Sequence, residues 1–210
     1  WSSDVCSSDL TETGLIENVL NYLTYVFLFL WIPVIFFIHI LFLNKNHFSK
    51  IATEQSPYNL LDRRIENELM PMCEYYGLGL ITWAPLAMGV LAGRYKKNEQ
   101  NPKNSRAILR GGFYADRVNE RGIDAGLKLN KIAKNLGLTS AQLAVLWVKH
   151  QKGVTAPLIG PRTIKQLKEF IKIIDISIDE SVCELCDQIV PPGSAVADFH
   201  NTAPWMKMRI

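Results

Sequence analysis

Two short apolar segments, each followed by a loop that contains proline, constrain the fold most strongly. Residues 78–83 are largely apolar, as expected for a parallel strand covered on both faces, and the chain breaks into a loop at Pro85. Residues 155–159 form a second such strand, which breaks at Pro161 before a helix begins at Thr163. Both strands therefore place a loop at their carboxyl end, where α/β folds bind ligands.

The remaining pattern alternates strands with helices. Residues 51–55 read as the end of a strand, and apolar residues recur at helical spacing over 60–76, where Pro71 should kink the helix or split it. Residues 95–120 form a long polar loop with a short helix. Further helices are expected to end at Gly137, to run through Trp147 and to span residues 179–189. This order favours a parallel sheet.

Two helix starts carry the form of a capping box. Thr139 is followed three residues later by Gln142, and Thr163 by Gln166. In this pattern the Thr and Gln side chains satisfy backbone N–H groups that the first turn leaves unpaired. We therefore expect helices to begin directly after Thr139 and Thr163.

The first 50 residues carry a different signal. Residues 1–10 resemble translated adapter sequence and are excluded from the fold. Residues 22–43 are apolar except for three positions, a length that spans a bilayer as a helix, and the lysines that follow would place the rest in the cytoplasm. Two interpretations stay open. Residues 11–50 are a transmembrane segment and linker, or this stretch is foreign to the rest of the chain and was joined to it by misassembly, a frameshift or an untranslated segment.

The charge distribution bears on the partner. Residues 1–43 contain no Lys or Arg and four acids, so the remaining 167 residues hold all 23 basic groups and 16 acids. This surplus of seven positive charges is spread without Arg-rich blocks. It fits a protein that binds an anionic cofactor, and we expect no nucleic-acid partner.

The cysteines indicate a reducing compartment. Four cysteines in 210 residues do not form a disulfide framework. Cys183 and Cys186 could suggest a redox or metal pair, but a second pair is lacking, so a zinc site is incomplete. We interpret both as small packing residues on the last helix and assign no metal ligand.

Three ordered motifs carry a family resemblance. They are residues 54–59 (Glu-Gln-Ser-Pro-Tyr-Asn), 82–95 and 159–169. Together they resemble the C-terminal half of an NADP-dependent aldo-keto reductase, of the branch with potassium-channel β subunits and bacterial aldehyde reductases. The likeness runs from about Ile51 to the C-terminus. It implies a domain over residues 51–210 that is an incomplete TIM (β/α)8 barrel, containing strands six to eight with their helices.

The resemblance implies residues at the nicotinamide end of an NADP site. Trp83 would stack on the ring and Gln55 would hydrogen-bond the carboxamide. The alternative role for Trp83 is packing in the core or at an interface. The loop would approach the phosphates closely because glycine and alanine leave room; its residues are Ala84, Pro85, Leu86, Ala87 and Gly89. Ala84 stands where the family usually has Ser, which removes one hydroxyl contact.

The resemblance also implies the phosphate and adenosine contacts. Arg94 stands where the family often has Lys, so the positive charge is retained. Arg106 would reach over the cofactor; the alternative for Arg106 is a solvated surface role. Arg162 near a helix N-terminus can pair with the 2′-phosphate. The remaining implied adenosine-site residues are Gly160, Gln166 and Glu169. Phe170 replaces the usual Asn, and a plain capping box with solvated charges is the competing interpretation.

The proton-transfer residues of the family have no counterpart in the sequence. Its reaction needs a Tyr donor, a Lys, an Asp and a His. None of Tyr22, Tyr25, Lys45, His47 or Lys50 has the matching context, and we interpret a second group as packing residues: Tyr58, Tyr75 and Tyr76. We therefore assign no catalytic residue.

The sequence thus predicts a cytoplasmic fragment of an oxidoreductase that reduces aldehydes or ketones by hydride transfer. The intact enzyme would take a small-molecule carbonyl substrate. The alternative is a membrane-anchored, non-enzymatic module that senses nucleotide or associates with a channel, with its reductase part facing the cytoplasm. A third possibility is that a separate chain supplies strands one to five.

Overall fold

The computed structural model describes residues 51–200, nearly all of which belong to the second of two compact units, Ala52–Ile210. The predictions for residues 1–10, for 11–50 and for the apolar run 22–43 lie outside the described residues. Within residues 51–200, every helix is too short or too polar to cross a membrane.

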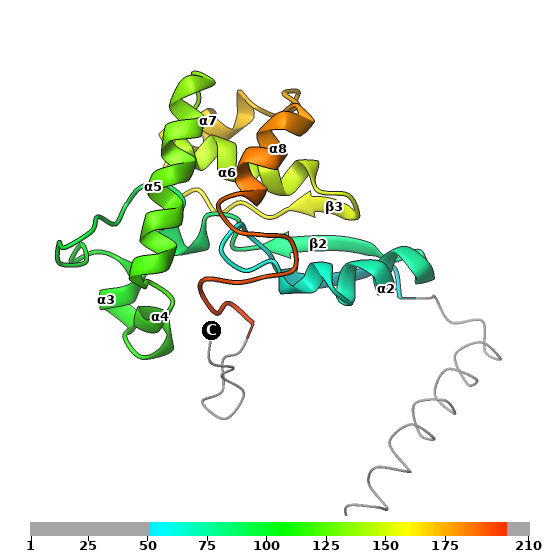
Figure 1. The fold of residues 1–210 in the computed structure, drawn as a ribbon, viewed down its shortest axis with the longest axis horizontal. Helices are drawn as coiled ribbons and strands as arrows, with labels where there is room; N and C mark the ends of the chain where they lie inside the picture. Colours follow the sequence, from blue (N-terminus) through cyan, green and yellow to red (C-terminus); the bar gives the residue numbers. More distant parts are fainter. Residues whose placement is uncertain (1–50, 201–210) are drawn as a thin grey trace, which may run out of the picture. The chain divides into compact units, whose positions relative to one another are not determined.

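A three-stranded parallel sheet positions the rest of the described unit (Figure 1). Its strands are β1 (Thr53–Pro57), β2 (Gly79–Trp83) and β3 (Val154–Pro157), in the order β1-β2-β3. The register aligns Pro57 with Trp83 and Thr82 with Pro157, so all three strands end at the same edge. The three predicted strands and their parallel arrangement are confirmed.

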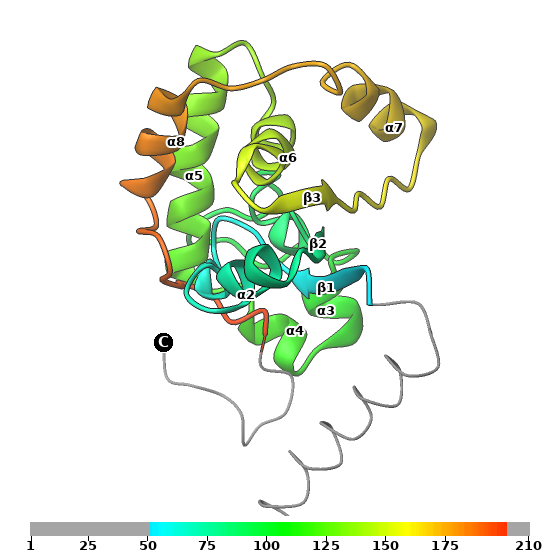
Figure 2. The same ribbon diagram turned by 90° about the vertical axis from the view of Figure 1, so that its right-hand side faces the viewer.

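Helices cover the sheet and fill the connections between strands (Figures 1 and 2). The helices are α2 (Leu69–Tyr76), α3 (Arg106–Arg110), α4 (Phe113–Asp116), α5 (Glu120–Asn135), α6 (Ser140–His150), α7 (Ile164–Ile171) and α8 (Glu180–Asp187), with 3-10 turns η1 (Arg64–Glu66) and η2 (Ala87–Gly89). α6 packs on β3 and on α5, α5 contacts α8, and α2 packs on β2. Among the largest fully buried side chains are Trp147, Tyr58 and Leu80.

The predicted start of the helix over residues 60–76 is wrong. The Asn59 carboxamide oxygen accepts a hydrogen bond from the N–H of Leu61 at 2.9 Å, and this turn is followed only by η1. α2 begins at Leu69, so Pro71 lies in its first turn, where a missing N–H costs little. The break in the segment falls before Leu69 and α2 continues through Pro71, so the expectation that Pro71 splits the helix is wrong. Gly77 ends α2 in the left-handed conformation with φ +66°.

The expected helix starts are confirmed, but only one capping box is complete. At α6, Thr139 accepts from the N–H of Gln142 at 3.2 Å and Gln142 accepts from the N–H of Thr139 at 3.0 Å. At α7, Thr163 accepts from the N–H of Gln166 at 3.2 Å, but Gln166 accepts from the N–H of Arg162 at 2.7 Å instead.

A buried ionic cluster attaches the end of the described chain to its beginning. The Arg63 side chain is 3% exposed and donates to Glu66 at 2.7 Å, to Asp187 at 2.6 Å and to the carbonyl of Val190 at 2.7 Å. Its guanidinium also lies 5.0 Å from the ring centroid of Trp147. Arg63 thereby joins η1, α6 and the end of α8 through one side chain.

Replacing this arginine should destabilise the protein strongly. Arg63→Ala would leave two carboxylates without their cation, and breaking a buried pair typically costs about 3–5 kcal/mol. Urea unfolding of the full chain measures the free energy of unfolding. The matched control is Lys96→Ala, which removes an exposed pair with Glu99 at 3.3 Å and should cost less than about 1 kcal/mol. Equal costs for the two variants would contradict this role for Arg63.

Candidate functional site

A pocket of about 490 Å³ lies at the carboxyl edge of the sheet. Its walls come from the end of β2, the loop that follows it, the loop after β3 and the first turns of α7. Its volume falls within the roughly 300–1,000 Å³ typical of small-molecule sites. The pocket therefore lies at the edge of the sheet where the sequence predicted ligand binding.

The pocket brings together most of the residues that the sequence singled out. Ten of the predicted positions line it: Trp83, Ala84, Pro85, Leu86, Gly89, Arg94, Arg106, Gly160, Arg162 and Gln166. Trp83 and Arg162 come from positions 79 residues apart and share this one cavity. The two loops therefore form a single site.

Three predicted positions do not line the pocket. Gln55 lies exposed on β1, and Ala87 is completely buried in the core. The Glu169 carboxylate accepts a hydrogen bond from the Lys172 ammonium at 2.8 Å, while its carbonyl accepts from Gln142 at 2.9 Å. Ala87 is thus a core packing residue, and Glu169 makes contacts within α7 and with α6.

The structure adds lining residues that the sequence did not identify as site residues. All are apolar: Met88, Ala92, Ala141, Leu158, Ile159, Pro161 and Phe170. Six of them lie within or directly beside the two motif segments, residues 82–95 and 159–169. Ala141 comes from the first turn of α6 and carried no local signal.

The loop after β2 has an unusual backbone. Ala84, Ala87 and Met88 all have positive φ, at 59°, 47° and 59°. Such conformations are uncommon for residues with a Cβ and cluster at functional sites. The N–H of Ala87 donates to the carbonyl of Ala84 at 2.9 Å, and that of Gly89 to Leu86 at 2.8 Å. These two donors are used inside the loop and hold its conformation.

Three arginines supply the positive charge. Arg94, Arg106 and Arg162 line the pocket, and none of the described residues that line it is acidic. The Arg94 guanidinium also donates to the carbonyl of Asn104 at 2.8 Å, which fixes its position. With Trp83 in the same cavity, the arrangement suits a ligand that has an aromatic ring and several anionic groups.

The cysteines of α8 are buried, as the sequence predicted for small residues on the last helix. Cys183 is 6% exposed and Cys186 is fully buried. Burial raises the pKa of Cys183 to about 11 and that of Cys186 to about 12, so both remain thiols at neutral pH. In residues 51–200 all three cysteines are free.

The tyrosines divide into two kinds. Tyr58 is fully buried, its hydroxyl donates to Glu66 at 2.5 Å, and its ring lies 5.3 Å from that of Trp147, so its predicted packing role is confirmed. The same prediction is wrong for Tyr75 and Tyr76, which are 83% and 69% exposed and contact one another on α2. The residues before position 51 that were compared with the catalytic set lie outside the described residues: Tyr22, Tyr25, Lys45, His47 and Lys50.

The chain belongs to the aldo/keto reductase family. The family model matches residues 38–191. Proteins of this family generally use a nicotinamide cofactor and act on small carbonyl compounds. The predicted family resemblance is confirmed.

Individual relatives agree with this assignment. The chain is 35% identical over 157 residues to "Uncharacterized oxidoreductase YrpG" of Bacillus subtilis, which covers 74% of this chain and 46% of that protein. It is 38% identical over 128 residues to a "Probable voltage-gated potassium channel subunit beta" of Oryza sativa, covering 59% of this chain and 38% of the relative. The chain therefore spans less than half the length of these curated relatives.

A solved structure shares the fold. The glycerol dehydrogenase of Gluconobacter oxydans matches 73% of this chain and 48% of its own, with a TM-score of 0.56 and 24% identity. The described unit thus has the fold of part of a TIM-barrel-like protein, with a partial sheet of three parallel strands.

Gly89 should be sensitive to substitution for a reason specific to this loop. Its φ is +98°, and a Cβ would lie 3.3 Å from Cδ of Arg94. Gly89→Ala therefore combines backbone strain with crowding of a pocket arginine. Gly153→Ala is the matched control, because Gly153 has φ +90° and nothing within 4 Å. We expect about 1 kcal/mol of destabilisation for Gly153→Ala and more for Gly89→Ala in urea unfolding. Equal losses would show that the contact with Arg94 is not tight.

Proposed function

We propose that this chain is the cofactor-binding part of an NADP-dependent aldo-keto reductase that reduces aldehydes or ketones. The observation that supports this most directly is the shared pocket, which holds Trp83 and three arginines without an acidic residue. NADP carries a planar nicotinamide ring, a pyrophosphate and a 2′-phosphate. The pocket offers an aromatic face and cations for these groups.

Each of the two loops would bind a different part of the cofactor. Trp83 at the end of β2 provides a face for the nicotinamide, and Arg94 and Arg106 provide charge for the pyrophosphate. Arg162 precedes the N-terminus of α7, where the helix dipole also favours an anion, and is assigned to the 2′-phosphate. Gly160 leaves the loop beside it open, since nothing lies within 4 Å of its Cβ position.

The three strands correspond to strands six to eight of a (β/α)8 barrel. In residues 51–200, β1 and β3 each have a neighbour on one side only. Exposed apolar side chains near the end of β3 and along α7 include Leu158, Ile159, Ile164 and Ile171. These features support a domain that lacks its first half, which in the family carries the groups that transfer a proton to the carbonyl oxygen.

The bound cofactor would supply a hydride to the carbonyl carbon of a small substrate. The described residues would hold the cofactor and orient its ring, and none of them is assigned as the proton donor. We therefore expect cofactor binding without turnover by this chain alone. A cytoplasmic location is part of this proposal, with membrane attachment only if residues 22–43 are native.

A second candidate function is a non-enzymatic, channel-associated module that senses nucleotide. The observation that favours it is the 38% identity to a protein described as a probable potassium channel subunit beta. Both candidate functions use the same pocket. They are distinguished by whether the full-length protein turns over a carbonyl substrate and by whether it binds a channel partner.

Arg162 tests the cofactor assignment. Arg162→Ala should weaken NADP⁺ binding by about 10–100-fold, the loss expected for one or two charge-assisted hydrogen bonds, and should change NAD⁺ binding little. Calorimetric titration of the full chain with each cofactor at fixed salt gives the dissociation constants.

Lys165→Ala is the matched control. Lys165 lies on α7 and is exposed, but it does not line the pocket. This substitution removes the same charge, three residues further along, from the first turn of α7. Both affinities should therefore stay within about twofold, as for a screened surface charge. Equal losses of NADP⁺ and NAD⁺ in Arg162→Ala would contradict the 2′-phosphate assignment, and an absence of binding by the unmodified chain would contradict the proposed function.

A further inference from the structure

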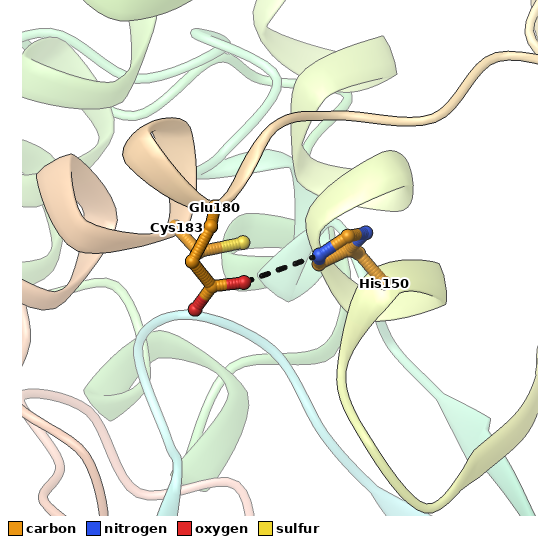
Figure 3. Close-up of side chains that lie close together, drawn as sticks. All are labelled: His150, Glu180 and Cys183. Atoms are coloured by element: carbon orange, nitrogen blue, oxygen red, sulfur yellow. Dashed lines mark ion pairs between the residues drawn. The ribbon is translucent and has the colours of Figure 1, made fainter.

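A second cluster of chemically active side chains lies away from the pocket, where α6 ends and α8 begins (Figure 3). His150 is the last residue of α6, and Glu180 and Cys183 lie three positions apart on α8. This spacing places Glu180 and Cys183 on one face of the helix. Figure 3 shows both of these side chains beside the His150 ring.

The distances are those of a nearly formed coordination site. Nε2 of His150 lies 3.6 Å from Oε2 of Glu180, and the three potential ligand atoms all lie within 4.8 Å of one another. Zinc bonds of roughly 2.0–2.3 Å place tetrahedral ligand atoms roughly 3.3–3.8 Å apart. The histidine and glutamate already satisfy this separation. A shift of about 1 Å by the thiol or by the exposed glutamate would complete it.

We propose that His150, Glu180 and Cys183 bind a divalent transition-metal cation of the zinc type, with water as a fourth ligand. Cys183 would bind as the thiolate, and its proton would be released to solvent as the metal–sulfur bond forms. Imidazole and thiolate ligands favour zinc over calcium and magnesium, which prefer oxygen ligands. Four-coordinate zinc accepts this mixture of nitrogen, sulfur and oxygen donors. The site is separate from the cofactor pocket and does not depend on the proposed function.

Burial and charge agree with this assignment. Glu180 is 81% exposed and the His150 side chain 34%, which leaves an open side for a cation and a water molecule, while Cys183 closes the inner side at 6%. The charges that act on Cys183 are Glu180 and Asp187, both negative, and Arg63, which is positive. Arg63 is already paired with Asp187 and Glu66. The local balance therefore does not repel a cation.

The surrounding contacts hold the two helices in place for such a site. The ammonium of Lys149, next to His150, donates to the carbonyls of Ile174 and Ile176 in the segment that leads into α8. The helix ends are therefore held together without a metal. A bound cation would add a direct link between α6 and α8 and should raise the stability of the terminal helix.

Cobalt(II) is the probe, because a thiolate ligand gives it a charge-transfer band in the near ultraviolet. Titration of the reduced, metal-free full chain should produce this band with one equivalent, and zinc should abolish it by displacement. Zinc should also raise the thermal unfolding midpoint, and a chelator should reverse the rise. A second readout is the loss of one titratable thiol on metal binding.

Single substitutions assign the ligands. His150→Ala and Glu180→Gln change exposed side chains and should leave the fold intact, and each should weaken metal binding by more than the roughly 10–100-fold typical of losing an outer-shell partner. Cys183→Ser should remove the charge-transfer band. Cys73→Ser is the control, because Cys73 is an equally buried free thiol on α2 and should leave binding unchanged.

Two results would overturn the proposal. One is the absence of a thiolate band in the unmodified protein, which would leave His150 and Glu180 as an ordinary surface ion pair. The other is a band that persists at full affinity in both His150→Ala and Cys183→Ser, which would place the metal at other residues of the chain.

Discussion

Parallel pairing of three strands is the constraint on which the rest of the described unit depends. Parallel neighbours need long crossover connections, and here these supply α2 between β1 and β2 and the series α3 to α6 between β2 and β3. Because all three strands run the same way, their following loops must meet at one edge. The register pairs Trp83 with Pro57. Just after β3, the N–H of Leu158 donates to the carbonyl of Thr82 at 2.7 Å. The pocket is the consequence of that alignment.

The strained loop after β2 is held from behind by the helices. Ala87 and Leu91 are fully buried, and the hydroxyl of Ser140 at the start of α6 donates to the carbonyl of Leu91 at 2.6 Å. α5 also packs closely against this loop, since a Cβ added to Gly126 would lie only 2.8 Å from the carbonyl oxygen of Val90. The core thus stabilises positive φ angles that the local sequence disfavours. The face of the loop that lines the pocket is therefore positioned before any ligand arrives.

Local patterns in the sequence predicted the elements whose causes are local. The two apolar runs predicted β2 and β3, and Thr139 and Thr163 marked the starts of α6 and α7, because caps and strand patterns act within a few residues. Residues 60–68 were assigned wrongly because their conformation is fixed from far along the chain: the carboxylate of Asp62 accepts the N–H of Phe199 at 2.7 Å. The same limit applies to the site. Motif loops identified most of the pocket, whereas Ala141 and the junction of His150 with Glu180 arise only from tertiary packing.

We propose that the loops after β2 and β3 form one site for a phosphorylated dinucleotide. Backbone amide chemical shifts of the isotope-labelled chain, followed by NMR during titration with NADP⁺, measure whether both loops respond. We expect saturable shifts in two segments at once, residues 83–94 and 158–170, with one dissociation constant. Shifts confined to one loop, or gathered on surfaces away from both, would contradict it.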